Sequence, residues 1–288
     1  MPHSHDRHPL MSRINVAAVG ALAAFAWVAM PTPAHAAEMF LKPASPRTEA
    51  GAEQFVQLVN GSFEQSVSSV ARERMRDVSV VRGTHITHPA PGDWQDKRNA
   101  AHLRLRTEEA GTYLVGVSTA PSIVTMPAAD FAAYLKRDGM PDALAAFERD
   151  SRGAPVRERY SKHARALIQA GDTRTNEYSR PLGYALEFIT DQNPYDLRFG
   201  KELGFRLLFR GKPLANQLVK ASYGGFHGHD AAGNHVSSYQ LRTDAQGHAT
   251  LLLSNKGHWY LSAIHMQKAA DGKADYESNW ATLTFHVK

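Results

Sequence analysis

The last third of this chain consists of short apolar segments separated by turn signals at intervals of roughly ten residues. Turns are indicated at Gly211-Lys-Pro213 and at Thr243-Asp-Ala-Gln-Gly247. Short strands at this spacing are typical of all-β sandwiches, so residues 193–288 are predicted to form one. The segments predicted as strands are residues 203–209, 217–223, 248–253, 259–264 and 280–287.

The first half of the chain also carries strand patterns, of which residues 102–106 are the clearest. Leu103 and Leu105 share one face there, while Arg104 and Arg106 share the other. The other strands are predicted at residues 53–59, 78–81, 112–117 and 184–189, and helical patterns cover residues 127–136, 142–149 and 160–170.

A turn at residues 191–194, Asp-Gln-Asn-Pro, separates the two parts and marks a candidate domain boundary. We therefore expect a mainly β protein with two β-sandwich-like domains. The first domain spans residues 37–192 with a helical insertion at about 127–170, and the second spans residues 193–288.

The N-terminus has the three-part pattern of a secretory signal peptide. Arg13 precedes an apolar run at residues 16–30, and Ala34-His-Ala36 supplies a small-residue cleavage motif. A retained anchor is the alternative, but the run is shorter than the ~20 residues of a membrane span. We predict a leader over residues 1–36, with Met11 as an alternative start. The mature chain is expected in the periplasm, without a transmembrane segment.

Composition excludes several kinds of function. The chain has a formal net charge of +5, and its basic residues are scattered, so no nucleic-acid partner is expected. It contains no cysteine, which excludes disulfide scaffolds, thiolate metal sites and cysteine nucleophiles. Any bound metal must therefore use histidine, carboxylate, methionine or backbone ligands.

Three C-terminal segments together resemble a transthyretin-like or carboxypeptidase-regulatory-like β-sandwich. They are GKPLANQLVKASY, TDAQGHATLLL and KGHWYLSAIHM. The resemblance implies a transthyretin/immunoglobulin-like fold for the second domain and says little about function.

A wider set of segments resembles one bacterial periplasmic family, the domain-of-unknown-function family 4198. The segments are AEMFLKP, RERYSKHARALIQAG, LEFITDQNPYDL and ESNWATLTFHV. The family is associated with nickel or cobalt uptake, which implies a transport accessory role and a membrane metal transporter as partner. Its members often begin the mature chain with a histidine, whereas Ala37 occupies that position here.

The segment GGFHGHDAAGNH, residues 224–235, contains three histidines and one aspartate, all of them potential metal ligands. His227 and His229 are two residues apart and would share one face of a strand, and Asp230 or His235 could close the site from the turn. Such ligands suit Ni, Co, Cu or Zn. A solvated polar loop is the alternative, because Gly-His-Asp and Gly-Asn are ordinary turn sequences.

Other polar groups offer weaker candidates. His265 precedes Met266 at the end of a predicted strand and is the next candidate metal ligand. His85 and His88 lie in proline-rich surroundings that favour a loop. The run 157–163, RERYSKH, lacks the features of a catalytic motif, and its charges are better interpreted as ion pairs that join the two domains.

The sequence therefore predicts a non-catalytic periplasmic protein that binds or delivers a transition metal. The predicted ligands are His227, His229, Asp230, His235 and His265. The alternative is a cell-envelope interaction module that recognises a protein or glycan through its sandwich loops, and an enzyme ranks third.

Overall fold

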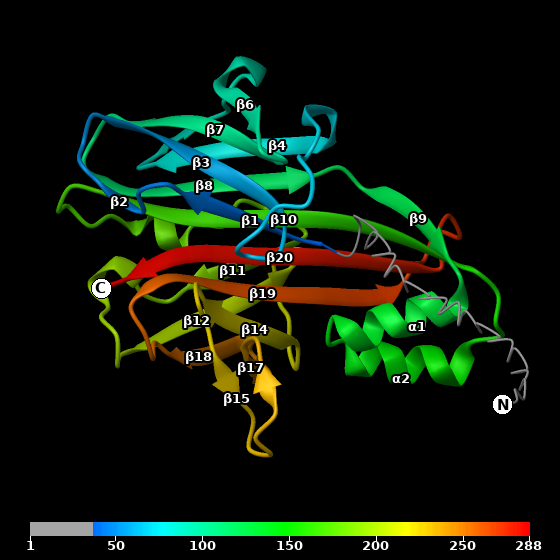
Figure 1. Ribbon diagram of the computed structural model, residues 1–288. Helices are drawn as coiled ribbons and strands as arrows, with labels where there is room; N and C mark the ends of the chain where they lie inside the picture. The colour runs from blue at the N-terminus through cyan, green and yellow to red at the C-terminus, as the bar shows by residue number, and fades with distance from the viewer. Residues whose placement is uncertain (1–36) are drawn as a thin grey trace, which may run out of the picture. The chain divides into compact units, whose positions relative to one another are not determined.

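One ten-stranded sheet runs through residues 37–288, the part of the chain that the computed structural model describes. Its main path is β17-β14-β19-β20-β10-β8-β4-β5, and β2 and β9 both pair with β10. Figure 1 shows the long strands β10 and β20 side by side. The bounds are β2 Arg47–Thr48, β4 Met75–Arg82, β5 His85–Thr87, β8 Gly111–Thr119, β9 Ser122–Met126, β10 Val156–Ala170, β14 Leu218–Tyr223, β17 Tyr239–Arg242, β19 Gly257–Lys268 and β20 Tyr276–Val287.

Three smaller sheets accompany the large one. The first has the order β1-β3-β7-β6, the second is β11-β12-β13 with β18 paired to β12, and the third is the hairpin β15-β16. Their strands are β1 Glu38–Pro43, β3 Ala52–Gly61, β6 Trp94–Lys97, β7 Ala100–Thr107, β11 Leu186–Thr190, β12 Glu202–Phe209, β13 Lys212–Pro213, β15 Gly228–His229, β16 His235–Val236 and β18 His248–Leu252.

Each half of the large sheet packs against one of the four-stranded sheets. Leu41, Leu58 and Leu103 of the first small sheet share a core with residues of β4, β8 and β10. Phe188 and Phe205 of the second share another core with residues of β14, β19 and β20. Burying a side chain of this size stabilises the fold by about 1.5–3 kcal/mol. The predicted mainly β, sandwich-like fold is confirmed.

Two helices lie between β9 and β10, as the sequence predicts. They are α1 Ala128–Arg137 and α2 Pro141–Asp150. Gly139, with φ of +73°, permits the tight turn between them, and Pro141 occupies the first turn of α2. Phe131 and Phe147 pack against Tyr276 of β20, so the pair is fixed to the sheet.

The helix predicted at residues 160–170 is wrong, because this segment is part of strand β10. Its alanines, arginine, leucine and glutamine favour a helix when they are considered alone. In the structure β10 pairs with β8, β9 and β20, and every residue from 164 to 170 is buried. Tertiary pairing and burial on both faces override local propensity here.

Backbone pairing crosses the predicted boundary between residues 192 and 193 in two places. β11 pairs with β12 directly across it, and β10 pairs in parallel with β20 from Glu158↔Tyr276 to Ala166↔Thr284. The division into domains 37–192 and 193–288 stays a prediction. The predicted leader, residues 1–36, lies outside the described residues.

Candidate functional site

The histidine-containing segment 224–235 forms the β15-β16 hairpin, which connects β14 to β17 at the edge of the large sheet and projects at the bottom of Figure 1. Asp230 builds its turn. One carboxylate oxygen, Oδ1, accepts hydrogen bonds from the backbone N–H groups of Ala232 and Asn234, both at 2.9 Å. The other, Oδ2, accepts one from the Asn234 side chain at 3.0 Å. These hydrogen bonds lower the pKa of Asp230.

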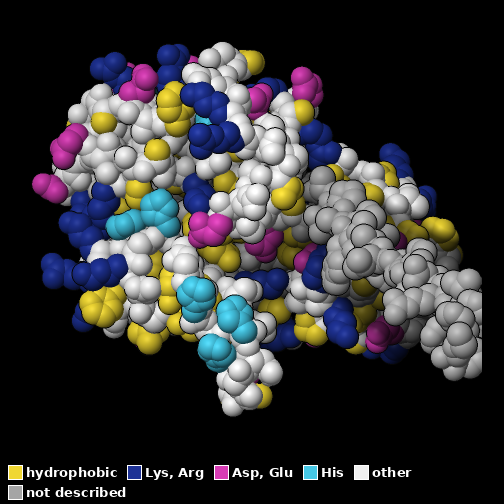
Figure 2. All heavy atoms as spheres, viewed as in Figure 1, with side chains coloured by type: hydrophobic (Ala, Val, Ile, Leu, Met, Phe, Trp, Pro, Cys, Tyr) yellow, Lys and Arg dark blue, Asp and Glu magenta, His cyan; other side chains and the backbone are white. Residues whose placement is uncertain are grey.

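The hairpin register brings the three histidines to one face. His229 pairs directly with His235 across the strands, and their ring centres are 5.8 Å apart. His227 lies two residues before His229, and its ring centre is 6.2 Å from that of His235. All three side chains are exposed, and Figure 2 shows a group of histidines on the hairpin. Of the predicted ligands, His227 and His229 therefore both lie near His235.

An aromatic cluster fixes the base of the hairpin to the sheet. Phe226 makes edge-on contacts with Tyr223 and Tyr239, at ring-centre distances of 5.1 and 4.9 Å. Both tyrosines contact the fully buried Trp259 of β19. The histidines lie between the turn and this base, and the base is fixed to the sheet through Trp259.

His265 belongs to a different environment. Its Nδ1 lies 3.0 Å from Oε1 of Gln217, and its ring centre is 4.5 Å from that of Phe209. Burial lowers the pKa of its imidazole. Neither contact belongs to the hairpin, so these contacts do not join His265 to the other predicted ligands.

Two further histidine pairs lie elsewhere. His88 contacts the Val78 carbonyl at 2.9 Å, and its neighbour His85 is exposed on β5. His258 and His286 face each other across β19 and β20, with ring centres 5.5 Å apart. Burial lowers the pKa of His286 to about 4. Sequence reasoning missed this pair because the two residues meet only through strand pairing.

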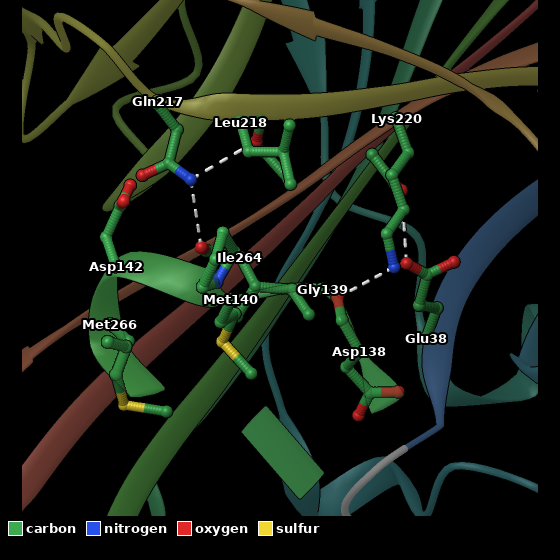
Figure 3. Close-up of a pocket in the computed structure, with 14 residues that line it drawn as sticks. Glu38, Asp138, Gly139, Met140, Asp142, Gln217, Leu218, Lys220, Ile264 and Met266 are labelled. Atoms are coloured by element: carbon green, nitrogen blue, oxygen red, sulfur yellow. Dashed lines mark hydrogen bonds between the residues drawn. The ribbon is translucent and has the colours of Figure 1, made fainter. Parts of the chain in front are cut away.

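A small pocket is built around Glu38, which sequence reasoning did not single out (Figure 3). Ser262 donates a hydrogen bond to its Oε1 at 3.0 Å, and Lys220 donates one to the Asp138 carbonyl at 2.7 Å. Burial raises the pKa of Glu38. Met140 and Met266 line the other side. At about 70 Å³ the cavity is well below the ~300–1,000 Å³ that is typical of small-molecule sites.

Among residues 37–288, no group of three or more His, Asp or Glu side chains stands in a geometry that could hold a metal ion. The hairpin histidines are therefore close to one another but do not converge on a common point in these side-chain positions. Within the same residues, no helix is long and apolar enough to cross a membrane.

A family model described as "Domain of unknown function (DUF4198)" matches residues 34–267. No curated protein sequence matches this chain significantly.

Several solved structures show a distant likeness. The D0-D1 domain of intimin is 13% identical, covers 86% of this chain and 97% of its own, and gives a TM-score of 0.22. The Yersinia pseudotuberculosis adhesin InvE is 14% identical, and the match covers 88% of this chain and 60% of the adhesin with a TM-score of 0.19. The human OSCAR ligand-binding domain is 11% identical, and the match covers 87% of this chain and 98% of that domain with a TM-score of 0.20. TM-scores in this range support no inference about function.

Proposed function

The chain belongs to the DUF4198 family, and from this premise we propose that it is a non-catalytic metal-binding or metal-delivery protein of the periplasm. The proposed ion is a transition metal of the Ni, Co, Cu or Zn type, bound at the β15-β16 hairpin. The leader-like sequence of residues 1–36 supports export. The proposed partner is a membrane metal transporter that receives or supplies the ion.

The observation that carries the proposal is the cross-strand pair His229 and His235, with His227 on the same face. A directly opposed antiparallel pair holds its Cβ atoms about 4.5–5.5 Å apart, which allows two imidazoles to reach one ion. The Zn–N distance of about 2.0–2.1 Å requires the rings to move closer together than they stand. Because the three side chains are exposed, rotation about their side-chain bonds can supply this movement.

Asp230 has a different role in this proposal. Its two carboxylate oxygens accept three hydrogen bonds within the turn. The turn keeps His229 and His235 paired across the two strands. Asp230 therefore supports metal binding indirectly, by holding the hairpin in shape. His265 is not required.

Isothermal titration calorimetry of the metal-free protein with Ni²⁺, Co²⁺, Cu²⁺ and Zn²⁺ tests the proposal. We expect one ion per chain for at least one metal, with a Kd of about 1 μM or lower, a binding free energy of about 8 kcal/mol. A variant with His227, His229 and His235 all changed to alanine should lose this binding. His85→Ala, an exposed histidine on β5, is the matched control and should bind like the wild type.

Binding that survives in the triple variant would place the site elsewhere and contradict the proposal. If no metal binds the wild type, the hairpin is a polar loop, and the cell-envelope interaction module becomes the better hypothesis.

A further inference from the structure

A second cleft lies away from the hairpin, over one face of the large sheet. Its volume is about 870 Å³, within the range of about 300–1,000 Å³ that is typical of small-molecule sites. Arginines from three distant parts of the chain line it: Arg76 from β4, Arg159 from β10 and Arg210 from the β12-β13 turn. We call it the arginine cleft; its other polar residues include Asp77, Ser118, His163, Glu277 and Asn279.

The wall of the arginine cleft is held in place by hydrogen bonds. His163 lies between Ser118 and Asn279, with Nδ1 at 2.9 Å from the serine Oγ and Nε2 at 3.2 Å from the amide oxygen. Its ring stacks on Tyr184 at 5.6 Å between centres. Burial lowers the pKa of His163 to about 4, so its imidazole is neutral near pH 7.

The carboxylates of the arginine cleft are already occupied by the protein. Asp77 Oδ2 accepts hydrogen bonds from Tyr184 at 2.6 Å and from Ser79 at 2.8 Å. Glu277 accepts from Arg159 at 2.6 Å and from Arg210 at 2.8 Å. These arginines lower its pKa despite its burial. Both carboxylates are therefore already paired with donors of the protein itself.

The arginines of the cleft, in contrast, keep N–H groups that can donate hydrogen bonds to a ligand. Arg76 is exposed and forms no ion pair within residues 37–288. Arg210 uses its Nη2 on Glu277, and its side chain is 59% exposed, so other N–H groups of the guanidinium face the solvent. Arg210 also has φ of +51°, at a turn position where Asn, Asp or Gly is favoured.

We infer that the arginine cleft binds a small oxyanion, either a carboxylate or a phosphate, through Arg76 and Arg210. Guanidinium groups match both anions with paired, charge-assisted hydrogen bonds. Ser118 and Ser161 also line the cleft, so polar residues surround the two arginines. The site is independent of metal binding at the hairpin, since no hairpin residue lines it.

Calorimetric titration of the metal-free protein with citrate and, separately, with inorganic phosphate tests the inference. Glucose serves as the uncharged control. At least one anion should bind saturably at one per chain, and the identity of the better probe tells carboxylate from phosphate. A variant that combines Arg76→Gln and Arg210→Gln should bind at least tenfold more weakly. Lys212→Gln, an exposed cation next to the same turn but outside the cleft, should leave the affinity unchanged.

Thermal unfolding of each variant confirms that it is folded before titration. Equal affinity of the wild type and the double arginine variant overturns the inference, as does the absence of saturable binding of either anion by the wild type. An equal loss in Lys212→Gln would also overturn it, since it would show attraction by general surface charge.

Discussion

The histidine hairpin and the arginine cleft are two polar regions of the same molecule that are built in opposite ways. The hairpin places three histidines within nine residues of sequence, and its side chains are exposed. The cleft takes residues from β4, β8, β10, β20 and the β12-β13 turn, and its central histidine is only 4% exposed. A local cluster on a hairpin depends on its turn, whereas a cleft assembled across a sheet depends on the whole core beneath it.

The largest difference between the two regions should appear in stability. Arg165 and Glu187, each 1% exposed in the side chain, form an ion pair of 3.0 Å beneath the cleft. Glu187 also accepts hydrogen bonds from the backbone of Leu182 and Gly183, which line the cleft. Glu187→Ala removes the carboxylate partner of a buried guanidinium and should cost about 3–5 kcal/mol in the free energy of unfolding.

Urea unfolding measures this cost, with the triple alanine variant of the hairpin as the comparison. Because the hairpin histidines are exposed, that variant should change the free energy of unfolding by no more than about 0.5 kcal/mol. Similar costs in the two variants would contradict the contrast between the regions.

The second difference concerns how stability changes when the pH is lowered. Unfolded chains protonate histidine near pH 6.5, but buried His163 takes up its proton only at about pH 4. The unfolded state therefore binds more protons between these values, and stability falls as the pH is lowered through this window. The contribution of His163 is fully present above about pH 6.5 and amounts to roughly 3 kcal/mol.

Unfolding measured from pH 7 to pH 4 tests this contribution. His163→Gln, which keeps a hydrogen-bonding side chain between Ser118 and Asn279, should lose stability less steeply on acidification than the wild type. Burial also lowers the pKa of His286 to about 4, so this residue changes stability with pH in the same direction. Because it is present in both the wild type and the variant, it does not affect the comparison. An unchanged slope in the variant would show that His163 is not responsible.

The sequence predicts the elements of this protein better than the contacts between them. Period-two segments and turn residues predict most of the long strands, and the apolar spacing predicts α1 and α2. The segment 160–170 is predicted wrongly because Ala164 to Ala170 is buried by neighbours that are distant in sequence.

The two sites differ in the same way. The hairpin cluster is visible in the sequence because its histidines are close together along the chain. The contact partners Ser118, His163 and Asn279 are separated by 45 and 116 positions, and only the pairing of β8, β10 and β20 brings them together. The sequence predicts His265 as a further candidate ligand from its place beside Met266, and its contacts lie with Gln217 and Phe209.

The smallest expected effect is the change in metal affinity caused by substituting Asp230. Its size shows whether Asp230 is a turn residue or a metal ligand. The side-chain oxygen of Asn can accept the same backbone hydrogen bonds as Oδ1 of Asp230. Asp230→Asn should therefore change metal affinity by less than about threefold, roughly 0.7 kcal/mol. Asp230→Ala removes the turn hydrogen bonds and should weaken binding more. Calorimetry of both variants measures the difference, and a loss of tenfold or more in Asp230→Asn would identify the carboxylate as a ligand.

The most direct test of the central claim is long-range ¹H–¹⁵N NMR of the histidine rings during titration with Zn²⁺. This experiment follows each imidazole separately and needs no substitution. The proposal predicts that the ring signals of His227, His229 and His235 change together and saturate at one equivalent, while those of His163 and His265 do not move. Saturable changes confined to other histidines, or no change in the hairpin, would contradict it.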